Sequence, residues 1–89
     1  MLSASTKREL RAKAHSLKPV VIIGQRGVTD SVLASITEAL DAHELIKVRL
    51  PGGDRTEQPA RIAHIASSLL AEVVGTIGRV LILYRKAPQ

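Results

Sequence analysis

Hydrophobic positions recur along the chain with two different periods, and this pattern predicts seven elements in the order α-β-α-β-α-β-β. Apolar side chains at helical spacing predict three helices, at residues 5–15, 29–44 and about 59–70. Short runs of β-branched or alternating apolar residues predict four strands, at Val20–Ile23, Leu45–Leu50, Val73–Ile77 and Val80–Tyr84. The sequence shows no internal repeat and no low-complexity segment.

This order predicts a two-layer α/β (α+β) fold built on a four-stranded mixed sheet. Strand-helix-strand units join parallel strands by right-handed crossovers, so the second and third helices should lie on the same face of the sheet. Val80–Tyr84 is apolar on both faces, which predicts a central, antiparallel strand. Val20–Ile23 is also apolar on both faces and should be buried. The first helix is then the element left to cover part of the second face.

Cap and turn residues support these boundaries. Thr6 and Glu9 have the spacing of a capping box at the start of the first helix. Thr29 is a suitable N-cap for the second helix. The Gly78-Arg79 pair between the last two strands predicts a type II′ hairpin turn, which requires glycine in its first position.

The length and composition narrow the class of protein. Eighty-nine residues predict a single domain over residues 1–89. The absence of cysteine rules out a disulfide framework and a thiolate metal site. The N-terminal stretch lacks the apolar core of a signal peptide, and no apolar run approaches the length of a membrane span. We therefore expect a soluble cytoplasmic protein with no membrane association.

Charge is unevenly distributed. Thirteen Lys and Arg residues face eight Asp and Glu, a balance that suits a polyanionic partner such as nucleic acid. Basic residues crowd the first helix and the segment after it, and Lys7, Arg11 and Lys18 are the candidates there for contact with RNA. Residues 27–46 contain no Lys or Arg but several acids, so the exposed side of the second helix should repel phosphate.

The strongest candidate for a binding element is the loop Gly24-Gln25-Arg26-Gly27. It lies between a strand and a helix, at the carboxyl end of the strand, where open α/β sheets tend to bind ligands. Its glycines permit positive φ or a close backbone approach, and Gln25 and Arg26 would project from its tip. Arginine can bind a phosphate with two hydrogen bonds. A G-x-x-G loop clamps nucleic-acid backbone in the KH module, but an ordinary tight turn has the same spacing, and the residues alone leave both readings open.

Other chemistry has little support in the sequence. His15, His43 and His64 are scattered, without metal-ligand spacing, and we predict no catalytic residue, no metal site and no cofactor. His43 beside Glu44 reads better as the end of a helix than as an acid-base pair. A chain with one aromatic residue cannot bind RNA by aromatic stacking alone, so any contact should be directed at the backbone.

Lys47 and Arg49 alternate with the apolar residues of their strand. This spacing is typical of a strand with one half-polar face. The two side chains are therefore either a solvated face or a surface that contacts RNA, and the pattern does not decide between them.

Three stretches together resemble the CRM domain, named for chloroplast RNA splicing and ribosome maturation: LKPVVIIGQRGVT, HELIKVRL and IGRVLILYR. The resemblance covers about residues 3–86 and is greatest to the stand-alone bacterial YhbY type. It implies the sheet order 1-2-4-3, similar to that of the C-terminal domain of translation initiation factor three. It also implies an RNA contact through the GQRG loop, with Lys47 as the basic residue of the second stretch. One departure is Leu69-Leu70, where Thr-Gly is expected at the end of the third helix.

We therefore expect a non-enzymatic, monomeric RNA-binding protein. The resemblance implies that it associates with ribosomal RNA in precursors of the large subunit and assists their assembly. The residues predicted to contact RNA are Gly24, Gln25, Arg26, Gly27, Lys18, Lys47, Arg49, Lys7 and Arg11. The alternatives are DNA as the ligand, a protein-interaction adaptor that uses the acidic second helix, and a small hydrolase.

Overall fold

A computed structural model describes residues 2–53 and 55–87 of the chain. Its elements, in order, are α1 (Ala4–Ala14), β1 (Pro19–Ile22), α2 (Asp30–His43), β2 (Leu45–Arg49), the 3₁₀-helix η1 (Arg55–Glu57), α3 (Gln58–Leu69), β3 (Glu72–Ile77) and β4 (Val80–Tyr84). The predicted order of helices and strands is confirmed, and η1 is an addition to it. None of the helices in the described residues is long and apolar enough to cross a membrane.

The four strands form one mixed sheet in the order β1-β2-β4-β3. β1 pairs with β2 in parallel, and β4 is antiparallel to both of its neighbours, β2 and β3. The predicted sheet order and the central place of β4 are therefore confirmed. β4 is central because its side chains alternate between two apolar environments: Leu81 and Leu83 pack on one face, and Ile82 packs on the other.

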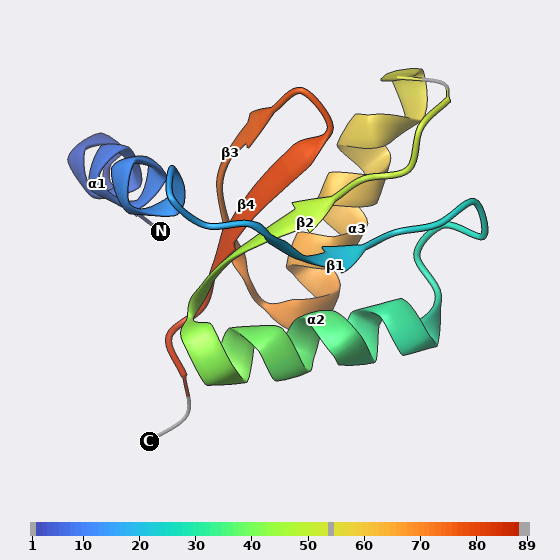
Figure 1. Ribbon diagram of the computed structural model, residues 1–89, viewed down its shortest axis with the longest axis horizontal. Coiled ribbons are helices and arrows are strands. Elements are labelled where there is room, and N and C mark those ends of the chain that lie inside the picture. Colours follow the sequence, from blue (N-terminus) through green and yellow to red (C-terminus); the bar gives the residue numbers. More distant parts are fainter. Residues whose placement is uncertain (1, 54, 88–89) are drawn as a thin grey trace.

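α2 and α3 cover one face of the sheet, as the crossover rule predicts (Figure 1). Ile36 and Leu40 of α2 and Ile65 of α3 are fully buried there. They pack against the buried side chains of the strands, which are Ile46, Val48, Leu81 and Leu83. We call this the α2/α3 face. It holds the larger of the two hydrophobic clusters.

α1 covers part of the opposite face, which we call the α1 face. Leu10 and Ala14 pack there against Val74 of β3 and Ile82 of β4. Figure 1 shows α1 at one end of the sheet, far from the loop that joins β1 to α2. The half of this face nearest that loop is not covered by α1.

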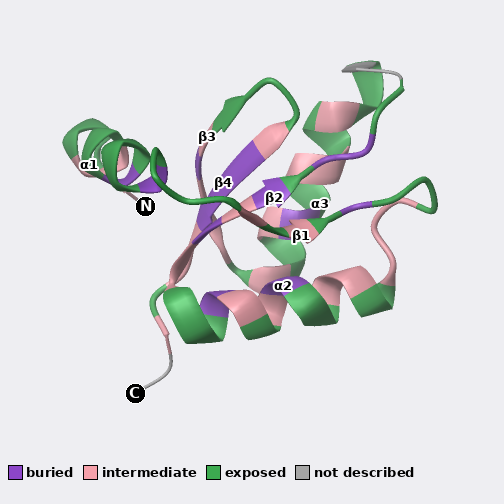
Figure 2. Cartoon of the chain, in the orientation of Figure 1, coloured by how far each residue is buried: buried purple, intermediate pink, exposed green. Residues whose placement is uncertain are grey.

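The exposure of β1 contradicts the prediction that this strand is buried. Val20 and Ile22 are 52 % and 68 % exposed, while the side chain before the loop, Ile23, is 2 % exposed. β1 lies at the edge of the sheet, and its two exposed side chains lie on the α1 face beyond the reach of α1. Figure 2 shows exposed and intermediate positions alternating along β1. An apolar strand is buried on both faces only where both faces are covered.

Hydrogen bonds at the helix starts explain where two helices begin. The hydroxyl of Ser3 accepts the N–H of Thr6 at 3.1 Å, so Ser3 is the N-cap of α1, and the capping box read at Thr6 and Glu9 is not the start of the helix. Three of the four residues from Ser3 to Thr6 carry hydroxyl groups, which made the choice of cap ambiguous in the sequence. The hydroxyl of Thr29 accepts the N–H of Val32 at 3.2 Å, which confirms the predicted cap of α2.

The backbone has positive φ at the two connections that flank β3, at Gly78 in the hairpin and at Leu70 after α3. Gly78 has φ 58° and Arg79 does not have positive φ, as a type II′ turn between β3 and β4 requires. At the end of α3, Leu70 adopts the left-handed conformation with φ 53°, and the N–H of Ala71 donates to the carbonyl of Ala66 at 3.0 Å. This is the helix end that glycine normally forms, so the chain keeps its shape with a leucine in the strained position.

Candidate nucleic-acid interface

The GQRG segment forms a tight, exposed turn between β1 and α2. The N–H of Gly27 donates to the carbonyl of Gly24 at 3.0 Å, which closes the turn. Gly27 has φ 75°, a conformation that a side chain disfavours, so this glycine is required by the backbone. Gly24 does not have positive φ, and a β-carbon there would meet no atom within 4 Å. The prediction that at least one of the two glycines has special geometry is confirmed for Gly27.

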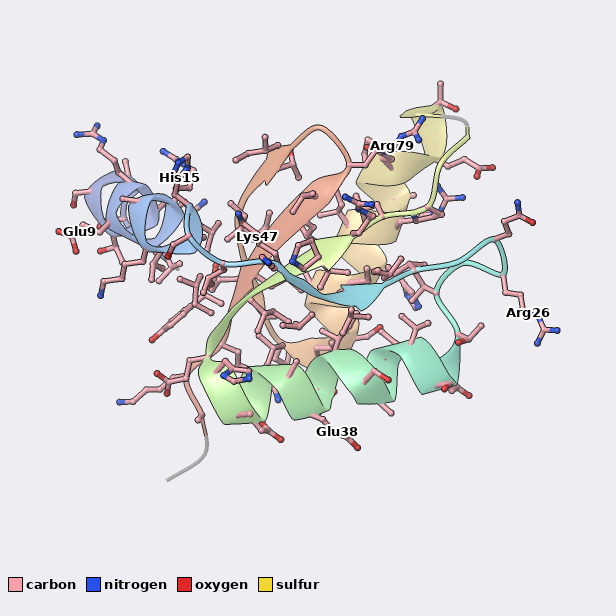
Figure 3. All side chains as sticks on the ribbon, viewed as in Figure 1. Glu9, His15, Arg26, Glu38, Lys47 and Arg79 are labelled. Atoms are coloured by element: carbon pink, nitrogen blue, oxygen red, sulfur yellow. The ribbon has the colours of Figure 1, made fainter. Side chains whose placement is uncertain are left out.

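Gln25 and Arg26 lie at the tip of this turn and are both exposed. Figure 3 shows the Arg26 side chain extending away from the body of the protein. The side chain makes no hydrogen bond or ion pair within the described residues. An exposed guanidinium on a closed turn is well placed to meet a phosphate, because both of its edges remain available.

The N-terminus of α2 lies next to the turn, but it already has a hydrogen-bonding cap and a negative charge from the protein itself. Thr29 caps the helix, and Asp30 places a carboxylate in its first turn. This negative charge complements the positive end of the helix dipole. A phosphate bound at this end of the molecule is therefore expected on the turn itself and on the neighbouring arginines, not on the end of the helix.

Two arginines converge on the same end of the sheet as the turn. The N–H of Ile23 donates to the carbonyl of Arg49 at 2.9 Å, and the N–H of Leu50 donates to the carbonyl of Arg79 at 2.7 Å. These bonds hold the end of β2 and the β3–β4 hairpin beside the residue that precedes Gly24. Both arginine side chains are exposed (for Arg79, Figure 3). The structure therefore places Arg49, a predicted contact, close to the loop.

Arg79 is a candidate that the sequence reasoning missed, because its pattern indicates only the second residue of a hairpin turn. A signal was nevertheless available. A two-residue turn before β4 puts Arg79 at the same end of the sheet as the carboxyl ends of β1 and β2. Basic residues in a hairpin at that edge belong among the candidates for phosphate contact.

Lys47 and Lys18 lie where the α1–β1 connection crosses the sheet. The ammonium group of Lys47 donates to the carbonyl of Leu17 at 3.0 Å, and Figure 3 shows Lys47 beside this connection. Lys47 is half-buried, so part of its role is to hold the connection in place. Lys18 is exposed and lines a shallow hollow together with Lys13 and Val20.

The basic residues of α1 lie at the other end of the molecule from the GQRG turn (Figure 1). Arg11 is committed to the sheet: its guanidinium donates to the carbonyl of Val74 at 3.2 Å, and its aliphatic part packs over Gly75. Lys7 is half-buried on the same helix. The structure thus separates the predicted contacts into a group at the turn and a group at α1. The residues 17–23 that run between them contain three exposed apolar side chains and no acid.

Asp30 lies beside the turn, but the acidic residues farther along α2 and at its end lie away from both groups. Glu38 points outward from α2, on the side opposite the sheet (Figure 3). Asp41 forms an ion pair with Arg85 at 2.8 Å, and the carboxylate of Glu44 accepts the N–H of Ala87 at 2.8 Å. Glu44 therefore fixes the C-terminal segment to the end of α2, which agrees with its interpretation as a helix-end residue.

The described residues offer no candidate metal site. Within residues 2–53 and 55–87, no group of three or more His, Asp or Glu side chains could hold a metal ion. His64 lies on α3 with its ring nitrogen 3.5 Å from the hydroxyl of Ser68, in an exposed position. His15 lies at the end of α1 and His43 at the end of α2, so the three histidines come from three separate elements.

Comparison with known proteins gives consistent results. The family model of the CRS1 / YhbY (CRM) domain matches residues 2–85. An RNA-binding protein of Haemophilus influenzae is 44 % identical over 88 residues, covering 99 % of this chain and 89 % of that protein. A probable RNA-binding protein of Bacillus subtilis is 35 % identical, covering 100 % and 93 %.

A solved structure gives the same result for the fold. It is the solution structure of a Staphylococcus aureus protein described as an RNA-binding candidate, with TM-score 0.86 and 28 % identity. The match covers 100 % of this chain and 93 % of that one. The similarity therefore extends over the whole fold.

Proposed function

The chain belongs to the CRS1 / YhbY (CRM) domain family, and we propose that it is an RNA-binding protein that contacts RNA backbone through its GQRG turn and the adjacent basic surface. The observation that carries this proposal is the position of Arg26, Arg49 and Arg79. All three are exposed at one end of the sheet, and the hydrogen-bonded ends of β1, β2 and the hairpin hold them there.

The family relatives support RNA as the ligand, because those named above are described as RNA-binding proteins. The physical reason is that a closed turn with an exposed arginine offers hydrogen bonds to phosphate without requiring a particular base. In our proposal Gly24, Gln25, Arg26, Gly27 and Arg49 contact the RNA directly. Lys18, Lys47, Lys7 and Arg11 extend the positive surface toward α1, and the last three also have structural contacts or partial burial.

The proposed physiological partner is ribosomal RNA in precursors of the large subunit, whose assembly the protein assists in the cytoplasm. It acts as a monomer and without catalysis or a cofactor. Folded ribosomal RNA suits this surface, because recognition that depends on backbone position requires an RNA whose shape holds its phosphates in fixed places. The acidic outer side of α2 would remain turned away from the RNA.

The test compares affinities for an RNA fragment of the large subunit and for DNA of the same sequence, each at several salt concentrations. We expect tighter binding to the RNA, with log affinity falling linearly with log salt. In parallel, the tagged protein should sediment with large-subunit precursors, and RNA crosslinked to it in cells should map to large-subunit RNA. Equal affinity for DNA would contradict RNA specificity. Association with a protein that persists at high salt would favour the adaptor alternative.

A further inference from the structure

Strand register places four side chains in one row across the uncovered half of the α1 face. Ile22 of β1 lies beside Arg49 of β2. Arg49 lies opposite Val80 of β4, and Val80 lies opposite Ile77 of β3. The row therefore reads Ile22–Arg49–Val80–Ile77 across the sheet, with one cation among three apolar side chains. Ile22 and Ile77 are 68 % and 62 % exposed.

A cleft of about 540 Å³ lies over the Ile22–Arg49–Val80 part of this row, at the end of the sheet nearest the GQRG turn. Ile22, Arg49 and Val80 contribute to its walls, together with Gly52, Gly78 and Arg79 from the two adjoining loops. Its size falls within the range of small-molecule sites, about 300–1,000 Å³. None of the described residues that line it is acidic.

The glycines leave room for the guanidinium of Arg79 at the mouth of the cleft. A β-carbon on Gly52 would lie 2.9 Å from a guanidinium nitrogen of Arg79, so any larger residue there would displace that side chain. Gly78 is the residue whose positive φ sets the hairpin and so the direction in which Arg79 leaves it. The two loops together place a second cation beside Ile22 and Val80, the apolar side chains that flank Arg49.

The geometry points to a binding site for one unpaired nucleotide of the RNA in this cleft. The base would lie against Ile22 and Val80, and the guanidinium groups of Arg49 and Arg79 would meet its phosphates. Arginine planes can also stack on a base. This inference rests on the proposed function and adds to it a preference for RNA in which a nucleotide is extruded from a helix.

Two features favour a nucleotide over other occupants. An exposed apolar surface that adjoins the two arginines suits a ligand that is apolar on one side and anionic on the other, and a nucleotide has both properties in one unit. The site also begins at Ile23, directly before Gly24, so an RNA backbone held on the GQRG turn would already pass its entrance. A single aliphatic wall offers less surface than an aromatic platform, so the expected preference is modest.

The experiment uses the full chain and two RNA hairpins that differ only in one bulged uridine. Ile22→Thr removes apolar surface at the cleft and keeps a β-branched residue in the strand. Leu70→Asn is the matched control, because Leu70 is 86 % exposed and lies at the end of α3. Loss of one to two buried methyl or methylene groups predicts that Ile22→Thr weakens binding to the bulged RNA about threefold to tenfold. Its affinity for the fully paired hairpin, and both affinities of Leu70→Asn, should match those of the wild type.

A second measurement locates the nucleotide directly. With 4-thiouridine at the bulge, crosslinks should map to the peptides around Ile22, Arg49 or Arg79. Equal affinity of Ile22→Thr and wild type for the bulged RNA would overturn the inference, and so would crosslinks confined to α1. In either case RNA binding by the wild type would leave the proposed function standing. Failure of the wild type to bind either hairpin would overturn both.

Discussion

The two faces of the sheet are covered to different extents. On the α2/α3 face, two helices bury Ile36, Leu40 and Ile65 completely against the strands. On the α1 face, one helix covers half of the sheet, and Ile22 and Val20 remain exposed beside the other half. Both faces are built from the same strands, whose side chains alternate between them. The difference in burial between the two faces therefore comes from how much of each face the helices cover.

This difference separates the residues that hold the fold from those that are available to a partner. A fully covered face leaves no side chain free to contact RNA, so substitutions of its buried residues should act through the stability of the fold. The uncovered half contributes little to stability, and its apolar and basic side chains can meet a ligand at small cost to the fold. Three substitution experiments test this separation, each with a matched partner.

The largest effect is expected from Leu83→Ala compared with Ile22→Ala. Leu83 is fully buried on the α2/α3 face, so its truncation leaves a cavity and should lower the free energy of unfolding by about 2–5 kcal/mol. Ile22 is 68 % exposed, so its truncation should change that free energy by about 0.5 kcal/mol or less. Urea unfolding of the two variants measures both values.

The comparison of the faces fails if the two truncations cost the same. A cost of about 2 kcal/mol or more for Ile22→Ala would mean that the uncovered half is packed against something in solution, such as a second copy of the chain. Sedimentation of the wild type would then distinguish a dimer from a monomer.

The second comparison concerns the two glycines of the turn. Gly27 has φ 75°, so Gly27→Ala forces alanine into a left-handed conformation and should cost about 1–2 kcal/mol of unfolding free energy. Gly24 does not have positive φ, and a β-carbon added to it would lie in open space, so Gly24→Ala should be nearly neutral. Thermal melts of the two variants give the ranking.

The RNA affinity of Gly24→Ala then tests whether RNA approaches the backbone at Gly24. If RNA approaches the backbone at Gly24, alanine there should weaken binding in a protein whose stability is unchanged. Unchanged affinity of Gly24→Ala would restrict the role of the turn to its side chains. Equal stability of the two variants would show that the turn tolerates alanine at both ends, contrary to the geometry of Gly27.

Much of the fold could be predicted because local chemistry and tertiary packing agree. The apolar run of β4 requires cover on both faces, which only a central strand receives. Gly78 with positive φ and Thr29 as a cap are local signals that the structure retains. The closed turn at Gly24–Gly27 was predictable for the same reason, since glycine spacing between a strand and a helix specifies a tight connection.

The remaining features depend on contacts that a sequence does not display. The apolar residues of β1 indicate burial, but whether α1 reaches them depends on where that helix docks. Lys47 and Arg11 were predicted as RNA contacts, yet both side chains donate hydrogen bonds to carbonyl groups that are distant in the sequence. Arg79 was overlooked because its neighbours in space, the end of β2 and the loop at Gly52, are far from it in sequence.

The smallest expected effect on stability, and the most direct test of the turn, comes from Arg26→Ala. Arg26 is exposed at the tip and makes no hydrogen bond or ion pair within the described residues, so its removal should change the free energy of unfolding by about 0.5 kcal/mol or less. Arg8→Ala is the matched control, because Arg8 is an exposed arginine on α1 and its loss lowers the net charge equally.

If Arg26 binds a phosphate, Arg26→Ala should weaken binding to different RNA sequences about equally and reduce the slope of log affinity against log salt by about one. Arg8→Ala should have a smaller effect on both quantities, because Arg8 lies at the far end of the molecule. If Arg26 instead contacts a base edge, the loss should fall on particular sequences and the slope should change little. Titrations at several salt concentrations, with thermal melts to verify folding, distinguish these outcomes. Equal effects of the two substitutions would show that the turn contributes only general positive charge, and the RNA contact would then have to be sought along the surface between Lys18 and Arg49.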